Sequence, residues 1–388
     1  MMRKILILCL LSGLLVDTVN AQRRKRNRRD KDKTETTTTT VTPVTKDSTK
    51  KRKRILLKPK DLSDQMAYHS LKEALKNADS VFVLDFPLKK FTYFPKDILK
   101  LRNLQVLEMV YGELDSLPPV IADSLDYLQV LNLKNNKLTS LPTEMAKMKH
   151  LRRLNLEYNL LEDIPDVMAN ISGLRSLNIK FNRLSKISDK IGALTQLQTL
   201  DLTANGITSL PKSFGQLSQL QELNLQANRI TTLPMSFTQL ANLKKLNLRQ
   251  NRFKVFPSHI FSLNQLTSLN LRKNKFSQIP SGITRLQQLE ELNLQQNALS
   301  SLPTGIAAWK KMKKLNLSKN KLTNFPVEIS QLSNLEELNL SFNQISTIPA
   351  NIGQLKKLKL LNVANNRLSS AEKNKLRSVL PVTTTIIY

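Results

Sequence analysis

Residues 197–219 read LQTLDLTANGITSLPKSFGQLSQ, and residues 289–311 read LEELNLQQNALSSLPTGIAAWKK. The two stretches share one arrangement of leucines, one asparagine and one proline. The same asparagine recurs every 23 residues from Asn136 to Asn366. A fixed period of this length means that one supersecondary unit is copied along an axis. The pattern therefore predicts a solenoid whose function lies on its surface.

Within each unit two leucines flank a single residue, as Leu200 and Leu202 flank Asp201. Alternate residues of a strand point to opposite faces, so the leucines enter the core and Asp201 points out. Each unit is therefore expected to add one short strand to a parallel sheet. The repeated asparagine should bond the backbone of its own and the adjacent unit, because a buried amide is costly unless its donors and acceptor are used. Eleven of the 16 prolines occupy the same position of the repeat, after the asparagine. Proline cannot continue a strand, so the strand geometry is expected to end before this position.

The pattern LxxLxLxxNxLxxLPxxIxxLxx resembles the 23-residue, LP-type class of the leucine-rich repeat family over residues 81–370. The resemblance implies an α/β solenoid, a curved horseshoe of about thirteen repeats with a parallel concave sheet. Departures lie toward the N-terminus, where a terminal repeat is expected to be atypical. They are Lys89 and Gly112 in place of the asparagine, Ser188 in place of the proline, and one residue inserted before Leu125.

Both ends carry capping segments, because the last layer of a solenoid core would otherwise meet water. Residues 61–80 are expected to form an N-terminal cap helix, opened by a capping box from Ser70 to Glu73. Residues 371–388 are expected to form a C-terminal cap of a helix and a strand, with the same signature from Ser369 to Glu372. This arrangement resembles the cap pairs of secreted bacterial leucine-rich repeat proteins.

Residues 1–21 read as a signal peptide, with an apolar run after Arg3 and Lys4 and small residues before Gln22. The only cysteine, Cys9, lies in that run, so the mature chain is expected to contain no disulfide. The prediction is a secreted or cell-envelope-associated protein. The dense positive charge that follows leaves a membrane-tethered and a cytoplasmic protein as alternatives.

Residues 22–60 contain sixteen Lys or Arg and only four acids, with a run of five threonines. This composition predicts a disordered, basic, Thr-rich linker. Its cations are also candidates for contact with an acidic polysaccharide, an anionic membrane surface or nucleic acid, of which nucleic acid is expected least. The candidate polyanion-binding residues are Arg23, Arg24, Lys25, Arg26, Arg28, Arg29, Lys51, Arg52, Lys53 and Arg54.

The concave sheet is the expected working surface, since its outward residues repeat at fixed spacing. One outward column holds ten asparagines, which are expected to stack amide to amide along the sheet. A neighbouring column varies, and aromatic and charged residues gather beside it, as at recognition sites. Packing of the aromatics into the loop edge and simple solvation of the charges remain alternatives. The candidate partner-binding residues are Tyr111, Lys134, Arg153, Glu157, Tyr158, Lys180, Phe181, Lys245, Arg249, Arg272 and Lys273.

Catalysis is not expected, because the sequence offers no nucleophile with a paired base and no phosphate-cradling glycine loop. The three histidines fall in different units, so no metal or cofactor is predicted. Trp309 occupies a slot that is leucine elsewhere and is assigned to packing. The resemblance implies an exported, non-enzymatic module that binds a protein partner on its concave face. An adhesin-like polyanion binder is one alternative, and an intracellular signalling scaffold, like the similar repeats of Ras-pathway regulators, is another.

Overall fold

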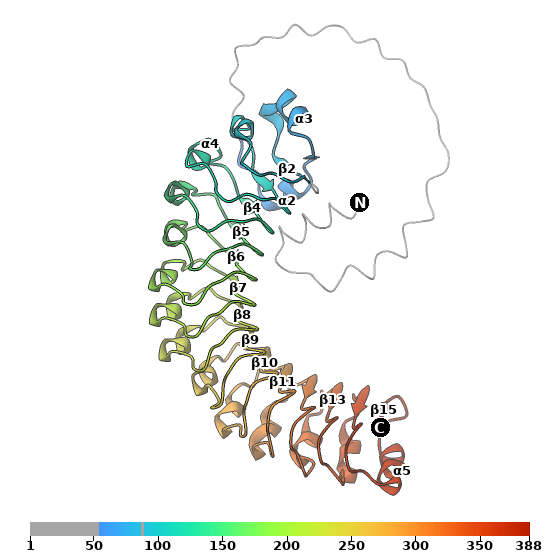
Figure 1. Ribbon diagram of the computed structural model, residues 1–388. Helices are drawn as coiled ribbons and strands as arrows, with labels where there is room; N and C mark the ends of the chain where they lie inside the picture. Colours follow the sequence, from blue (N-terminus) through green and yellow to red (C-terminus); the bar gives the residue numbers. More distant parts are fainter. Residues whose placement is uncertain (1–53, 87–88) are drawn as a thin grey trace, which may run out of the picture.

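The computed structural model describes residues 54–86 and 89–388. The expected signal peptide and most of the expected linker lie outside these residues. Fifteen short strands form one parallel sheet in chain order, from β1 to β15. Figure 1 shows an arc with the strands along its inner side and the short helices along its outer side. The predicted solenoid with a parallel concave sheet is confirmed.

Thirteen of the strands, β2 to β14, belong to the repeats, and β1 and β15 come from the two caps. The strands are β1 Ala67–Tyr68, β2 Val83–Asp85, β3 Val106–Glu108, β4 Val130–Asn132, β5 Arg153–Asn155, β6 Ser176–Asn178, β7 Thr199–Asp201, β8 Glu222–Asn224, β9 Lys245–Asn247, β10 Ser268–Asn270, β11 Glu291–Asn293, β12 Lys314–Asn316, β13 Glu337–Asn339, β14 Leu360–Asn362 and β15 Thr385–Ile387.

The outer side of the arc consists mainly of single 3₁₀ turns. The α-helices are α2 Pro59–Ser63, α3 Leu71–Lys76, α4 Ile121–Ser124 and α5 Ser370–Val379. The 3₁₀ helices are η1 Ala78–Ser80, η2 Lys96–Lys100, η3 Thr143–Lys147, η4 Asp166–Asn170, η5 Asp189–Ala193, η6 Lys212–Gln216, η7 Met235–Gln239, η8 Ser258–Ser262, η9 Ser281–Arg285, η10 Thr304–Ala308, η11 Val327–Gln331 and η12 Ala350–Gln354.

The start of each 3₁₀ helix explains the proline slot. Ten of the eleven helices from η2 to η12 have proline as the N-cap residue, and η5 has Ser188 instead. The Ser188 hydroxyl accepts a hydrogen bond from the Lys190 N–H, so it caps the helix in a different way. In the repeat with the inserted residue, Leu125 N–H bonds the Ile121 carbonyl at 2.9 Å, and the turn is α-helical rather than 3₁₀.

The expected asparagine ladder is confirmed. Asn228 is buried, and its Nδ2 donates to the carbonyls of Leu202 at 2.9 Å and Leu225 at 3.1 Å. Its Oδ1 accepts from the Ile207 N–H at 3.1 Å. Each ladder asparagine from Asn136 to Asn366 makes the corresponding three bonds. The ladder thus supplies partners to loop groups that the sheet cannot reach.

The residue before each ladder asparagine has a left-handed backbone, which the sequence did not indicate. In Tyr158, for example, φ is 54°, and its N–H donates to the Lys180 carbonyl of the next repeat at 3.0 Å. Such a conformation costs an L-residue roughly 1–2 kcal/mol. The residues with this conformation are Tyr111, Asn135, Tyr158, Phe181, Ala204, Ala227, Gln250, Lys273, Gln296, Lys319, Phe342 and Asn365.

The core lies between the sheet and the outer turns as one continuous cluster from Ala74 to Leu380. Trp309 is fully buried within it, and its Nε1–H donates to the Ile283 carbonyl at 3.3 Å. The assignment of Trp309 to packing is confirmed.

The C-terminal cap is bonded directly to the last repeat. The Ser369 hydroxyl accepts from the Glu372 N–H at 3.2 Å, as a capping box requires. The Glu372 carboxylate, however, accepts from the Ile348 N–H at 2.7 Å, so it links α5 to the preceding repeat. A Cβ on Gly353 would lie 2.4 Å from the Val379 carbonyl oxygen, which shows how closely α5 packs on η12.

The N-terminal cap differs from the expectation in two respects. Ser70 precedes α3, but its side chain makes no capping hydrogen bond. Residues 54–63, called here the N-terminal strap, fold back on the concave side of the sheet. Leu62 is fully buried in a second apolar cluster with Val83, Val106 and Val130, the outward residues that begin β2 to β4. The folded part of the chain therefore begins before the expected boundary at residue 61.

Candidate functional site

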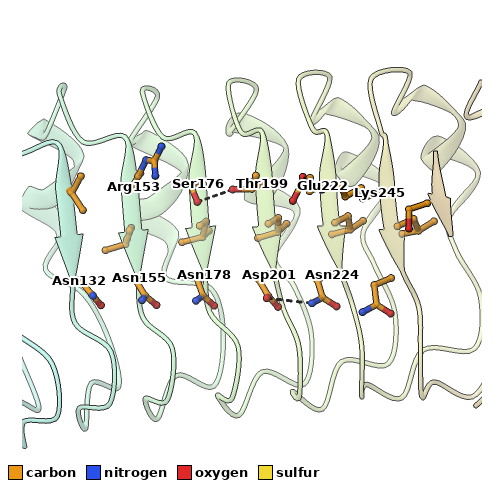
Figure 2. Close-up of a pocket in the computed structure, with 18 of the residues that line it drawn as sticks. Asn132, Arg153, Asn155, Ser176, Asn178, Thr199, Asp201, Glu222, Asn224 and Lys245 are labelled. Atoms are coloured by element: carbon orange, nitrogen blue, oxygen red, sulfur yellow. Dashed lines mark hydrogen bonds and ion pairs between the residues drawn. The ribbon is translucent and has the colours of Figure 1, made fainter. Parts of the chain in front are cut away.

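Three rows of outward residues make up the concave face. The strand-start row runs from Val83 to Leu360, and the asparagine row lies two residues further along each strand. The strand-end row follows after another two residues and includes Lys134, Glu157, Lys180, Thr203, Gln226, Arg249, Arg272, Gln295, Ser318 and Ser341. Figure 2 shows the first two rows side by side on β4 to β9, where they line a groove of about 510 Å³.

The asparagines of this row were predicted to stack amide to amide along the sheet, and that prediction is wrong. In each of ten asparagines and in Asp201 the side-chain oxygen accepts from the N–H two residues ahead in the same repeat, as Asn155 does from Glu157 at 3.1 Å. This local bond is nearer than a neighbouring amide, because a short polar side chain readily reaches its own backbone. The row therefore fixes the turn that follows each strand. The amide hydrogens stay available, and those of Asn178, Asn224 and Asn247 donate to the side chains of Glu157, Asp201 and Gln226 in the preceding repeats.

The N-terminal candidates form a compact group, called here the aromatic–ionic cluster, of Lys134, Glu157, Tyr158, Lys180 and Phe181. The Glu157 side chain is 8% exposed and lies between two ammonium groups, 3.0 Å from Lys134 Nζ and 3.4 Å from Lys180 Nζ. The Tyr158 and Phe181 rings stack with centroids 4.3 Å apart. Lys134 Nζ also lies 5.9 Å from the Tyr158 ring centroid. The cluster thus combines an ion triad of net charge +1 with an aromatic platform.

The aromatic side chains of this region stay exposed. Tyr111, Tyr158 and Phe181 are 46%, 43% and 38% exposed, so they do not pack into the loop edge. Tyr111 lies two repeats before Tyr158, with Asn135 in the same position between them. Arg153 begins β5 and belongs to the strand-start row (Figure 2), where burial lowers the pKa of its guanidinium.

The middle candidates divide into two groups. Lys245 lies in the strand-start row and pairs with Glu222 at 2.9 Å. Arg249 and Arg272 lie in the strand-end row of neighbouring repeats, half-buried, and the exposed Lys273 follows Arg272. The sequence predicted one group of four cations. In the structure, however, Glu222 neutralises Lys245, which also lies apart from the other three cations along the strand direction.

The N-terminal strap covers the concave side of β2 to β4. Gln105 accepts from the Leu57 N–H at 3.0 Å and donates to the Ile55 carbonyl at 2.6 Å. Gln129 donates to the Leu57 carbonyl at 2.7 Å. The sequence did contain a signal for this contact. The first residue of β2, β3 and β4 is valine, whereas most later repeats have a polar residue at the same position.

Arg54, a predicted polyanion-binding residue, is engaged within the protein. Its guanidinium bonds both carboxylate oxygens of Asp126, donates to the Arg102 carbonyl at 2.7 Å and lies 4.3 Å from the Tyr127 ring centroid. These contacts fix the start of the strap. The other candidates of the basic segment, residues 23–29 and 51–53, lie outside the described residues.

Within residues 54–86 and 89–388, no group of three or more His, Cys, Asp or Glu is arranged to hold a metal ion. In the same part of the chain, no helix is long and apolar enough to cross a membrane.

Two family models match the repeats described above. A model of a leucine-rich repeat region matches residues 166–252 and 215–307, and a leucine rich repeat model matches residues 102–161, 287–345 and 310–368. The chain belongs to the leucine-rich repeat family. Leucine-rich repeat proteins are typically non-enzymatic binding modules, and the fold commonly mediates protein binding.

Solved structures with the same fold come from bacteria and plants. A leucine-rich repeat protein of Leptospira interrogans is 32% identical with a TM-score of 0.69, and the match covers 84% of this chain and all of that one. An internalin from Listeria monocytogenes is 23% identical with a TM-score of 0.71, covering 80% of this chain and 88% of that one, which shows the fold alone.

A plant relative is a receptor ectodomain. The leucine-rich repeat ectodomain of the membrane receptor kinase GASSHO1/SCHENGEN3 from Arabidopsis thaliana was solved in complex with Casparian strip integrity factor 2. It is 30% identical with a TM-score of 0.61, and the match covers 76% of this chain and 39% of that one.

Proposed function

We propose that this protein is an exported, non-enzymatic module that binds a protein partner through its concave side. The aromatic–ionic cluster carries the proposal. Exposed aromatic rings beside charged groups are typical of interface hot spots, since the rings bury a large area with little loss of side-chain freedom. Tyr158 and Phe181 are stacked, and Lys134 and Lys180 are held by one carboxylate, so the surface is ordered before binding.

The position of the cluster supports this assignment. The cluster lies just beyond the strap, where the concave face becomes accessible. The strap itself shows that the face accepts an extended segment, because Gln105 and Gln129 bond its backbone groups. The apolar run within residues 1–21 supports export.

Site-directed photo-crosslinking in the native host would test the proposal. A photoreactive residue at Asn178, on the concave face, should crosslink one protein. The same residue at Gln196, exposed in the turn between η5 and β7, should not. The Asn178 crosslink should disappear when Tyr158 and Phe181 are changed to alanine. Equal crosslinking from both positions, or a crosslink insensitive to the alanine changes, would remove the concave cluster as the binding site. N-terminal sequencing of the exported protein should give Gln22.

A second candidate, a polyanion binder, rests on the charge of the basic segment. Residues 22–53 would carry this activity, because Arg54 is engaged with Asp126. Binding of an acidic polysaccharide should then fall steeply with salt and be lost when residues 22–53 are deleted. The protein partner of the first candidate should still bind after that deletion.

A further inference from the structure

Arg249 and Arg272 are neighbours on the concave side. They occupy the strand-end row of consecutive repeats, following β9 and β10, which pair in register with Asn247 opposite Asn270. The Gln250 N–H donates to the Arg272 carbonyl at 2.8 Å, so the two backbones remain adjacent beyond the strands. Adjacent strands lie about 4.8 Å apart. Two guanidinium groups therefore emerge side by side from one rigid surface.

Neither guanidinium is neutralised among the described residues. The Nε atoms of Arg249 and Arg272 are both buried, and each lacks a hydrogen-bond acceptor in the described part of the chain. Burial, and then the charge of Arg249, lower the pKa of Arg272. A half-buried cation without a partner is unfavourable, and a second cation beside it adds repulsion.

The surrounding chain supplies almost no negative charge. Residues 202–289 contain eleven Lys or Arg and one acid, Glu222, a net charge of +10. Glu222 is paired with Lys245 in the strand-start row. That row is four residues from Arg249, or about 13 Å along an extended strand. This separation exceeds the screening length of about 8 Å at physiological salt, so Glu222 leaves the arginine pair uncompensated.

The same face disfavours a long polyanion. The strand-start row carries charges of both signs from β8 onward, with Glu222, Glu291 and Glu337 set among Lys245 and Lys314. A polysaccharide or nucleic acid crossing the sheet would meet these carboxylates. A single carboxylate at the strand-end positions from Gln226 to Gln295 would meet only cations and amides in that row. Arginine binds a carboxylate through two parallel N–H donors.

We propose that Arg249 and Arg272 form a carboxylate-binding subsite that receives an Asp or Glu side chain of the protein partner. This inference rests on the proposed function and specifies the chemistry of the partner. Lys273, exposed beside the pair, adds positive charge at the entrance. The two arginines hold the acid, while the aromatic–ionic cluster, whose Lys180 lies three repeats before Arg249, contacts a different part of the partner.

Local crosslinking of an acidic peptide tests the subsite on the full chain. The probe is a C-terminally amidated hexaglutamate with a benzophenone group, at physiological salt, with crosslinks mapped by mass spectrometry. Crosslinks to residues 224–296 should fall at least tenfold in the R249Q/R272Q variant. The R252Q/K275Q variant removes the same charge from exposed positions of the same two repeats and should retain them. Crosslinks to residues 22–53 should be equal in all variants.

The remaining outcomes are equally decisive. Equal losses in both variants, or no crosslinks to residues 224–296, would overturn the subsite. A sulfated hexasaccharide that displaces the peptide from this region at lower concentration than hexaglutamate itself would assign the pair to polyanions instead. Relief of repulsion should leave the unfolding midpoint of R249Q/R272Q unchanged or raised, and R249K/R272K should bind the peptide with intermediate affinity. If R249Q/R272Q leaves the Asn178 crosslink to the partner intact, the subsite fails while the proposed function stands.

Discussion

The rings of Tyr158 and Phe181 lie parallel, with centroids 4.3 Å apart and planes inclined by 1°. They occupy the same left-handed position of consecutive repeats, with φ of 54° and 55°. The period of the solenoid thus sets the ring separation, since a repeat advances by about one strand spacing of 4.8 Å. A flat aromatic surface results from a backbone conformation repeated along the chain, and it requires no rearrangement before a partner binds.

Alanine substitutions at these two positions should separate binding from stability. A stacked pair contributes about 0.5–1.5 kcal/mol beyond the area buried, so a double-mutant cycle in urea should return a coupling of that size. Affinity for the crosslinked partner should fall at least tenfold, or about 1.4 kcal/mol, in Y158A/F181A. Phe342→Ala changes the equivalent position in a distant repeat, with a 49% exposed side chain, and should not affect affinity. Comparable losses of affinity in Y158A/F181A and Phe342→Ala would argue against a local site.

Two asparagines of one repeat should differ in their contribution to stability. Asn274 is buried and makes three backbone bonds, to Leu248 and Leu271 at 3.0 Å and from Phe253 at 3.3 Å. Asn274→Ala leaves these groups unpaired and should cost about 3 kcal/mol of unfolding free energy. Asn270 accepts one bond, from the Arg272 N–H, at a half-exposed site. Asn270→Ala should cost less than about 1 kcal/mol, and equal midpoints in urea would refute the ladder's role.

The repeats could be predicted from the sequence because their physics is local. Leucines at fixed spacing must enter one core, and a buried asparagine must use its amide, so the period, the strands and the ladder followed from residues such as Leu200 and Asn205. The left-handed position could not be found in this way. It is filled by Tyr, Asn, Ala, Gln, Lys and Phe, and no glycine marks it.

Contacts between distant residues were also beyond the sequence. Arg54 bonds Asp126 across 72 residues, and no periodicity connects them. The candidate site was predicted in part, because cations and aromatics in outward slots were visible. The sequence could not predict which cations are neutralised. The Glu157 triad and the Lys245–Glu222 pair depend on side-chain positions in the folded chain.

The left-handed position can be tested at Ala227, where φ is 55°. Ala227→Gly removes a steric cost of roughly 1–2 kcal/mol but increases the freedom of the unfolded chain by about 0.5–1 kcal/mol. A small net stabilisation, up to about 1 kcal/mol, is expected. Ala227→Val should destabilise by at least about 1 kcal/mol, because β-branched residues adopt this conformation least readily. Urea unfolding of both variants would decide, and a valine variant as stable as the glycine variant would contradict the assignment.

The N-terminal strap should determine where a stable fragment can begin. A fragment starting at residue 54 retains Leu62 over Val83, Val106 and Val130, whereas one starting at residue 64 exposes this apolar surface. Full burial of one leucine side chain contributes about 1.5–3 kcal/mol, so the shorter fragment should unfold at lower urea and bind a hydrophobic dye. Leu62→Ala in the longer fragment should cost about 2–5 kcal/mol. Identical midpoints for the two fragments would show that the strap does not stabilise the sheet.

The link between Glu372 and the last repeat should give the C-terminal cap a dependence on pH. Glu372→Ala leaves the Ile348 N–H without its acceptor and should cost about 1–3 kcal/mol, while Glu372→Gln keeps an acceptor and removes only the charge. The hydrogen bond from Lys375 and that from the Ile348 N–H lower the pKa of Glu372.

Because the folded pKa of Glu372 lies below its unfolded value, the charge stabilises the cap fully above the unfolded pKa of about 4.3. That contribution is lost as the pH falls through the folded pKa. The difference in unfolding free energy between the wild type and Glu372→Gln should therefore be constant from pH 7 to about pH 5 and vanish at lower pH. Subtracting the Glu372→Gln curve removes the titration of the other carboxylates. A difference that grows as the pH falls would show that the carboxylate destabilises the cap.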